Sequence, residues 1–158
     1  MHPLTIERIN PSDINLIQLV ADWYNNMEWK IEPSITITRL SDFANIGLPC
    51  HLLVKHDGTP VATGGLYADL GIGLLRVFPE YKKHPYWISL VYTLPEFRGQ
   101  GIAAFLCKAM EQLAKQHGLT KLNLYTNTAE KLYLREGWTP LERVIYKDSD
   151  TVIMEKDL

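Results

Sequence analysis

The sequence lacks the cysteine pattern of a disulfide-stabilised or zinc-binding protein. Only two of the 158 residues are cysteines, Cys50 and Cys107, and their spacing matches neither a zinc pair nor a redox dithiol. Cys107 lies in an apolar helical run and Cys50 opens an apolar stretch, so both are expected to pack as small hydrophobic side chains. The five histidines are scattered, and we therefore expect no metal site.

Long apolar runs and an excess of positive charge are also lacking. No apolar run is long enough to span a bilayer, and the N-terminal residues carry no basic-then-apolar signal, which together predict a cytoplasmic protein with no membrane partner. The formal net charge is -2, so a nucleic-acid partner is not expected either. An anionic ligand would have to be held by local groups.

What the sequence does contain is typical of one soluble globular domain covering residues 1–158. Hydrophobic residues make up 46% and charged residues 22% of the chain, and the length allows one well-formed core. Repeats, low-complexity stretches and glycine- or serine-rich linkers are absent from the sequence. The sequence leaves monomer and homodimer both open.

The N-terminal half is predicted to contain two helices and a hairpin. A strand over 4–9 precedes a helix that begins near Ile14 with Ser12 as its cap, and a second helix is expected over 35–45. The apolar runs 51–55 and 61–67 flank Asp57-Gly58, which favours a hairpin. Residues 69–73 are expected to form a loop, 74–78 a short edge element and 79–85 a polar excursion.

The C-terminal half shows clearer signals. We expect a strand over 87–93, a long helix over 100–117 closed by Gly118, and a strand over 119–125. A short helix over 129–136 ends at Gly137, and a final hairpin joins 141–146 to 151–155 across 148–150. The order of elements predicts an α+β fold with a mixed sheet and helices on its faces, and it excludes a doubly wound parallel fold.

The glycine-rich turn between the strand over 87–93 and the long helix is the most informative stretch. A helix start directs several unpaired N–H groups at one point, which suits a phosphate group. Gly99 and Gly101 would let the backbone approach such a ligand closely, and Arg98 adds a positive charge. The alternative is simply a tight turn into a buried helix. Neither the phosphate loop of kinases and GTPases nor the full dinucleotide fingerprint occurs here.

Two motifs at compatible spacing resemble those of one family. Arg98-x-x-Gly101-x-Ala103 is similar to the Arg/Gln-x-x-Gly-x-Gly/Ala signature of the GNAT superfamily of acetyl-CoA-dependent N-acetyltransferases. Ala129-x-x-x-Tyr133-x-x-x-Gly137-Trp138 resembles its second motif, with tryptophan where phenylalanine is usual. The resemblance covers about 87–158, while the first half agrees only in the order of elements.

The resemblance implies a mostly antiparallel central sheet and acetyl-CoA as co-substrate. In the family the pantetheine arm pairs with a strand, here Val91, Tyr92 and Thr93, and backbone N–H groups hold the pyrophosphate. Either Thr126 or Asn127 would also contact the cofactor. The pyrophosphate residues implied are Arg98, Gly99, Gln100, Gly101, Ile102, Ala103 and Ala104.

The resemblance further implies direct attack of an amine on the thioester, with a backbone N–H near Tyr92 or Thr93 polarising the carbonyl. Tyr133 is then the candidate acid beside the departing sulfur, the alternative being a packing role on its short helix. Many members use a glutamate on the central strand as base, but residues 86–89 contain no carboxylate. Glu28, Glu32, Glu80 and His84 are conceivable substitutes, and none is singled out.

The acceptor pocket in this family is shaped largely by the segment between the first two helices and by the final hairpin. Glu28 and Trp29 lie in the first of these segments and could hold a cationic amine by charge and by cation–π contact, although exposed loop residues often do nothing specific. A catalytically decayed CoA-binding sensor is the alternative to an active enzyme.

Overall fold

The computed structural model describes residues 3–28, 30–44, 46–68 and 73–158. The chain forms two compact units, Met1–Gly65 with Leu90–Leu106, and Leu66–Ser89 with Cys107–Leu158. Strand β4 (Trp87–Thr93) and helix α4 (Ile102–Gln116) each contribute residues to both units.

The first unit contains strands β1 (Leu4–Arg8), β2 (Cys50–His56) and most of β3 (Thr59–Tyr67), in the order β1-β2-β3-β4. β1 pairs antiparallel with β2, and the predicted hairpin between β2 and β3 turns on Asp57 (φ 51°) and Gly58 (φ 83°). Both residues are left-handed, as a tight two-residue hairpin requires, which explains the Asp-Gly sequence there.

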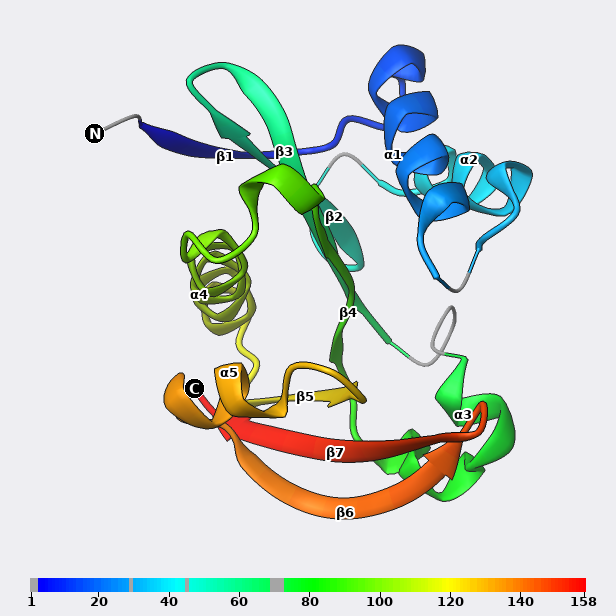
Figure 1. Ribbon diagram of the computed structural model, residues 1–158, viewed down its shortest axis with the longest axis vertical. Coiled ribbons are helices and arrows are strands. Elements are labelled where there is room, and N and C mark those ends of the chain that lie inside the picture. The colour runs from blue at the N-terminus through cyan, green and yellow to red at the C-terminus, as the bar shows by residue number, and fades with distance from the viewer. Residues whose placement is uncertain (1–2, 29, 45, 69–72) are drawn as a thin grey trace. The chain divides into compact units, whose positions relative to one another are not determined.

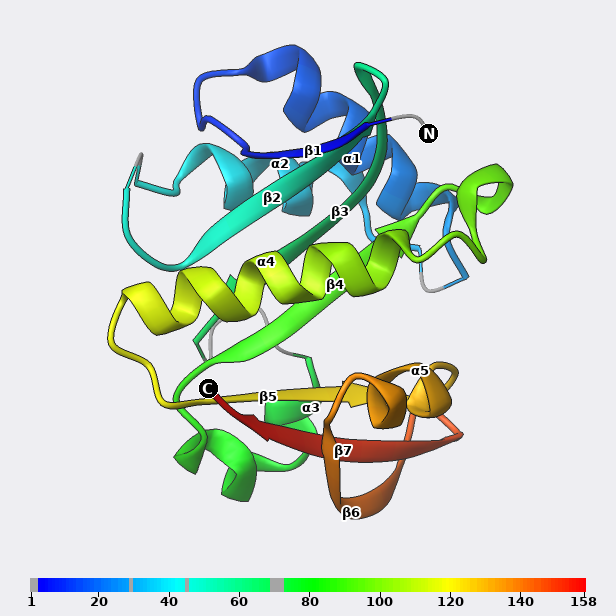
Figure 2. The same ribbon diagram turned by 90° about the vertical axis from the view of Figure 1, so that its left-hand side faces the viewer.

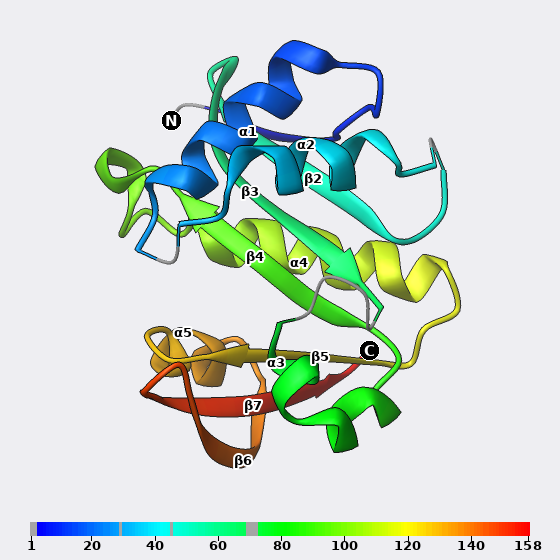
Figure 3. The same cartoon turned by 90° about the vertical axis from the view of Figure 1, so that its right-hand side faces the viewer.

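Helices α1 (Ile14–Asn26) and α2 (Pro33–Ser41) lie side by side next to these strands (Figures 1 and 3). They bury a cluster with strand residues of the same unit, and the buried members are Ile9, Ile17, Val20, Trp23, Tyr24, Leu40 and Leu53. The apolar spacing predicted for this helix is therefore the buried face of α1 from Ile17 onward, whereas Ile14 at its start is 77% exposed. The second helix begins and ends earlier than the sequence predicted.

The cap of α1 is Asp13, and the prediction of Ser12 is wrong. The Asp13 carboxylate accepts a hydrogen bond from the Leu16 N–H at 3.1 Å, the geometry of an N-cap. Ser12 instead bonds with both its N–H and its hydroxyl to the Asn10 side chain at 2.9 and 2.8 Å. Ser12 and Asp13 both have side chains that can cap a helix, and the hydrogen bonds of Ser12 to Asn10 leave the cap position to Asp13.

The second unit contains β5 (Lys121–Thr126), β6 (Thr139–Tyr146) and β7 (Ser149–Asp157), in the order β4-β5-β7-β6 (Figure 2). β5 pairs parallel with β4, and β7 pairs antiparallel with both β5 and β6. The final hairpin turns on Lys147 (φ 49°) and Asp148 (φ 60°). Ser149 and Asp150 therefore belong to β7, not to the turn over 148–150 that the sequence predicted.

One predicted element of this unit is also wrong. Residues 74–78 do not form an edge element, because Leu74–Val77 is the short helix α3, closed by a 2.9 Å bond from the Phe78 N–H to the Leu74 carbonyl. A 3-10 helix over Pro79–Lys83 follows and buries Tyr81. The predicted loop over 69–73 lies almost entirely outside the described residues.

The long and short helices of the C-terminal half agree with the sequence. α4 ends at Gln116 with Gly118 left-handed after it (φ 82°), and α5 (Glu130–Arg135) precedes Gly137 (φ 91°). The predicted α+β class is confirmed, with a mostly antiparallel sheet and a parallel β4–β5 pair. No helix within the described ranges is long and apolar enough to cross a membrane.

Candidate functional site

The turn before α4 is built on two left-handed glycines. Gly99 has φ 77° and Gly101 has φ 79°, a conformation that residues with a Cβ adopt only with strain. No atom lies within 4 Å of the position that a Cβ would take at either residue. Glycine is thus required by the backbone, and the space beside each α-carbon is open to a ligand.

The start of α4 follows directly from this turn. The Phe105 N–H donates to the Gly101 carbonyl at 3.0 Å, so the N–H groups of residues 102–104 precede the first intrahelical donor. These groups stand at the positive end of a 15-residue helix. Backbone donors and dipole together favour an anionic group such as a phosphate at this point.

Arg98 connects the turn to the end of β4. Its Nε donates to the Thr93 carbonyl at 2.9 Å, and its guanidinium lies 5.6 Å from the centre of the Tyr92 ring. Arg98 is exposed, so its positive charge remains available beside the glycine turn. The structure therefore brings Arg98, proposed for the pyrophosphate, into contact with Tyr92 and Thr93, which were proposed for the pantetheine arm.

β4 contains a kink that the sequence did not reveal. Leu90 has φ 58°, which places a branched residue in the left-handed region in the middle of a strand. Its carbonyl accepts a 2.5 Å hydrogen bond from the hydroxyl of Tyr24, a fully buried residue of α1. The kink immediately precedes Val91, the first of the residues expected to pair with the pantetheine arm.

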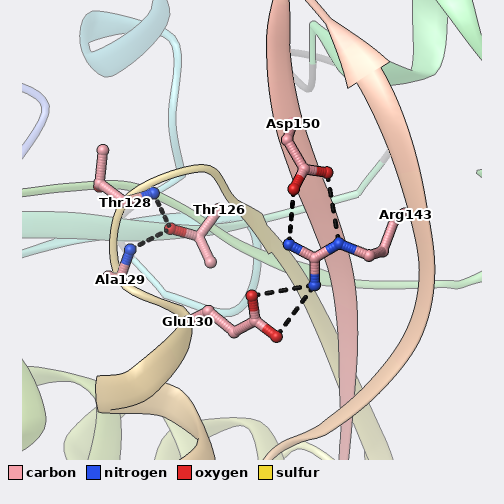
Figure 4. Close-up of polar contacts among 6 residues, drawn as sticks. All are labelled: Thr126, Thr128, Ala129, Glu130, Arg143 and Asp150. Atoms are coloured by element: carbon pink, nitrogen blue, oxygen red, sulfur yellow. Dashed lines mark hydrogen bonds and ion pairs between the residues drawn. The ribbon is translucent and has the colours of Figure 1, made fainter.

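Thr126 and Asn127, left open by the sequence, have different environments. The Thr126 Oγ accepts hydrogen bonds from the N–H groups of Thr128 (3.3 Å) and Ala129 (3.0 Å), which ties the residue to the start of α5 (Figure 4). Its oxygen is thus already used to shape the loop between β5 and α5. Asn127 is half-buried in the same loop.

Arg143 fixes the first turn of α5 to the β6–β7 hairpin. Its NH1 nitrogen lies 3.0 Å from both carboxylate oxygens of Glu130, while Nε and NH2 bond the Asp150 carboxylate at 3.3 and 2.8 Å (Figure 4). The bond from Arg143 holds the pKa of Asp150 below its usual value. These exposed contacts position the loop rather than form a reactive centre.

Tyr133 is a buried residue of α5 whose hydroxyl is hydrogen-bonded to the Cys107 side chain. Its ring also packs edge-on against Trp138, with centroids 6.0 Å apart. Burial, with a smaller contribution from Cys107, raises the pKa of Tyr133 above its ordinary value of 10. The hydroxyl is therefore protonated at neutral pH and acts as a hydrogen-bond donor more readily than as a full proton donor.

A group of polar residues around Tyr133 was missed by sequence reasoning. Lys156 Nζ lies 2.8 Å from the Glu111 carboxylate and donates to the Glu136 carbonyl at 2.7 Å. Burial raises the pKa of Cys107 to about 12, so its thiol stays protonated. Glu111 lies four residues after Cys107, and this helical spacing was the one available sign that it shares the buried face.

The residues proposed for the acceptor and for the base come from different segments of the two units. Glu28 is exposed just after α1, and Trp29 lies outside the described residues. Glu32 accepts a hydrogen bond from the Ser34 hydroxyl, and Glu80 is exposed. His84 stacks on Tyr81 with centroids 6.5 Å apart, and burial lowers the His84 pKa.

Tyr81 and its neighbours form a run of ring contacts in the second unit. The Tyr81 hydroxyl donates to the Glu142 carboxylate, which raises the pKa of Tyr81 to about 12. Further ring contacts link His84 to Trp87, Trp87 to Tyr125 and Tyr125 to Tyr146. The residues come from separate elements, so no local sequence pattern indicated this run.

Comparison with known proteins gives one family and a consistent fold. The family model described as Acetyltransferase (GNAT) family matches residues 16–138. Comparison with curated protein sequences gives no match.

Several solved structures share the fold at low sequence identity. The acetyltransferase of GNAT family from Streptococcus pneumoniae has a TM-score of 0.72 and 18% identity, covering 99% of both chains. The yncA protein of Salmonella typhimurium, solved with its cofactor acetyl-CoA, has a TM-score of 0.71 and 13% identity, covering 98% of this chain and 94% of that one. N-acetylglutamate synthase from Neisseria gonorrhoeae, complexed with coenzyme A and N-acetyl-glutamate, has a TM-score of 0.68 and 11% identity, and its match covers 99% of this chain and 35% of that one.

Proposed function

This chain belongs to the GNAT family of acetyltransferases, and from that premise we propose that it transfers an acetyl group from acetyl-CoA to an amine. The observation that carries the proposal is the turn at Gly99 and Gly101, open beside both α-carbons and leading into unpaired N–H groups of a long helix. This arrangement suits the pyrophosphate of coenzyme A. Two of the structurally similar proteins were solved with acetyl-CoA or coenzyme A, which supports the same ligand.

The proposed cofactor site uses the residues that the motifs indicated. The backbone from Arg98 to Ala104 holds the pyrophosphate, and Val91 to Thr93 pairs with the pantetheine arm. Of the two residues left open after β5, we assign Asn127 to the cofactor, because the Thr126 oxygen already accepts two backbone bonds. The family match extends over parts of both compact units, so we treat residues 1–158 as one functional domain.

The proposed reaction is direct attack without an acyl-enzyme. The neutral amine forms a C–N bond with the thioester carbon, the C–S bond breaks, and the sulfur leaves as a thiolate. The nitrogen loses one proton to solvent as the amide forms, and the thiolate takes up one proton from solvent, so the step balances. We propose that, with the cofactor bound, the Tyr133 hydroxyl exchanges its hydrogen bond to Cys107 for one to the departing sulfur, and that this bond strengthens as charge develops there. Its raised pKa supports this role, because full transfer of its proton to a thiolate of ordinary pKa about 8.5 is unfavourable.

The proposed acceptor is a cationic amine, such as a polyamine-like small molecule or a basic peptide N-terminus. Glu28 is exposed in the segment between α1 and α2, where a carboxylate could attract the ammonium group. We propose that Trp29, the next residue in the sequence, adds a cation–π contact. The first screen should therefore offer cationic, neutral and acidic amines side by side.

Calorimetry with coenzyme A tests the cofactor site, and two glycines provide a matched pair. Gly101→Val should weaken CoA binding by at least about 10-fold, because its side chain enters the space proposed for the pyrophosphate. Gly118→Val, after the other end of α4, carries the same left-handed strain in open space, so it should lower the thermal midpoint equally and leave CoA affinity unchanged. Equal affinities in the two folded variants, or no CoA binding by the natural protein at millimolar concentration, would refute the site.

A further inference from the structure

Leu90 adopts a left-handed backbone conformation that leucine does not itself favour. Leucine has a Cβ, so φ 58° is strained, and such a residue persists where surrounding contacts determine it. The kink falls between Trp87, which pairs with Asn123 of β5, and the segment Val91–Thr93 proposed to pair with the cofactor. The contacts that hold Leu90 therefore also set the direction of this segment.

The hydroxyl of Tyr24 supplies one such contact. It donates to the Leu90 carbonyl at 2.5 Å, and both Tyr24 and its neighbours in α1 belong to the buried cluster of the first unit. Tyr24 is fully buried, so its hydroxyl has little freedom to choose another partner. Loss of this donor from the partly buried Leu90 carbonyl would lower stability, because the carbonyl would lose the partner that Tyr24 supplies from the core.

His51 of β2 fixes the orientation of that hydroxyl. Its Nε2 lies 2.8 Å from the Tyr24 oxygen. A tyrosine hydroxyl has one hydrogen, and here the Leu90 carbonyl receives it, so the oxygen must accept from His51 and Nε2 must carry the proton. Burial, and then the charge of Arg39, lower the pKa of His51 to about 3, so the ring is neutral and holds this single tautomer at neutral pH.

The geometry of the peptide bond carries this constraint to the next residue. The bond between Leu90 and Val91 is trans, so its C=O and N–H point in opposite directions. Because Tyr24 holds the carbonyl, the Val91 N–H is directed away from Tyr24. Gly64 of β3 makes room at this point: an added Cβ would lie 3.4 Å from the Val91 Cα and 3.2 Å from its Cγ2.

The same helix also positions the rest of the segment. The Tyr92 ring packs edge-on against Tyr24 with centroids 6.4 Å apart, and it contacts Trp23 at 6.1 Å. The guanidinium of Arg98 lies over the Tyr92 ring, and its Nε bonds the Thr93 carbonyl. Contacts from α1 and from the turn thus hold β4 from the kink to its last residue.

We propose that Tyr24, oriented by His51, is a positioning residue for acetyl transfer: it holds the Leu90–Val91 peptide so that the Val91 N–H is presented to the thioester carbonyl, one residue before the Tyr92 that the sequence indicated. This rests on the proposed function. An N–H held in place before the reaction stabilises the developing oxyanion without reorganisation. Neither Tyr24 nor His51 touches the reacting atoms, so both act through the β4 backbone.

Tyr24→Phe tests the proposal, and Thr63→Val is its matched control. Thr63 is a buried residue of β3 whose hydroxyl donates to the Leu52 carbonyl of β2 at 2.7 Å, so its loss removes a similar bond whose acceptor is not on β4. Both variants should lower the thermal midpoint. Only Tyr24→Phe should lower kcat, by about 10-fold or more, with KM for acetyl-CoA within about twofold of the natural value. Equal kcat in the two variants would overturn the proposal.

Infrared spectroscopy of acetyl-CoA with a ¹³C-labelled carbonyl reads the polarisation directly. The bound carbonyl stretch should shift to lower frequency in the natural protein and in Thr63→Val, and return towards the free value in Tyr24→Phe. An unshifted stretch in the natural protein would overturn the proposal without any variant.

His51 offers a second pair of variants if Tyr24→Phe fails to fold. His51→Gln keeps an N–H donor and should retain most of kcat, whereas His51→Leu should lose it, and equal kcat in both would contradict the proposed orientation. The two hypotheses fail differently. No acetyl-CoA binding or turnover by the natural protein would refute the proposed function, whereas normal turnover with an active Tyr24→Phe would refute only the positioning role.

Discussion

The buried His51 makes a quantitative prediction about acid stability. Its side chain is fully buried, and its pKa of about 3 lies far below the ordinary value of 6.5. The folded state therefore resists protonation that the unfolded chain accepts readily. Stability contributed by the neutral ring is fully present above about pH 6.5 and is lost as the pH falls towards 3.

The size of the loss follows from the two pKa values. Each pH unit between them changes the free energy of unfolding by about 1.4 kcal/mol per proton. Between about pH 7 and about pH 4.5, protonation of His51 in the unfolded chain should therefore lower the free energy of unfolding by roughly 2.5 kcal/mol. That is a substantial share of the stability of an ordinary domain.

Urea unfolding of the natural protein and of His51→Gln at these two pH values isolates this contribution. Glutamine does not titrate, and every other titrating group, His84 included, is present in both proteins and cancels in the difference. The natural protein should lose roughly 2.5 kcal/mol more than His51→Gln on acidification. A difference in stability that stays the same at both pH values would refute the assignment of a neutral, buried His51.

Three further predictions concern other residues. Tyr133→Phe should lower kcat by about 10²-fold with CoA affinity nearly unchanged, because the charge on the sulfur develops mainly in the transition state; natural values of both would leave Tyr133 as a packing residue. Glu28→Gln should raise KM for a cationic acceptor and leave KM for acetyl-CoA alone, and added salt should weaken acceptor binding in the natural protein; a preference for neutral or acidic acceptors would contradict this assignment. Lys156→Met should lower the free energy of unfolding by about 1–2 kcal/mol because the half-buried Glu111 carboxylate loses its ion-pair partner. Lys156→Met/Glu111→Leu should recover most of that loss in urea unfolding, and no recovery would show that the ion pair is not its source.

The sequence predicted those features whose cause is local. Asp57-Gly58 and Gly118 adopt positive φ values, as their turn and cap roles require, and the strand over Trp87–Thr93 has the predicted bounds. Errors arose where local signals are ambiguous. A four-residue apolar run such as Leu74–Val77 fits a strand or a helix equally well, and adjacent Ser12 and Asp13 both have the chemistry of a cap.

The contacts that support the candidate site could not be predicted in this way. Tyr24 is 27 residues from its hydrogen-bond partner His51 and 66 residues from its partner Leu90 in the sequence. Nothing in the sequence around these residues indicates that they pair. The left-handed conformation of Leu90 is still harder to predict from the sequence, since leucine ordinarily avoids that conformation. Most of the residues proposed to bind the cofactor, in contrast, were indicated by a contiguous motif, because a glycine turn and a helix start are neighbours in the chain.

The most direct test of acetyl transfer is a balanced assay of both products with a panel of amines. Purified protein is mixed with acetyl-CoA and each amine, and the free thiol and the acetylated amine are measured in the same reaction. The proposed function predicts amine-dependent thiol release with one acetylated amine formed per thiol, fastest with cationic acceptors. Thiol release that is the same with and without amine, or no release by a protein that binds CoA, would contradict it, and the second result would indicate a CoA-binding sensor.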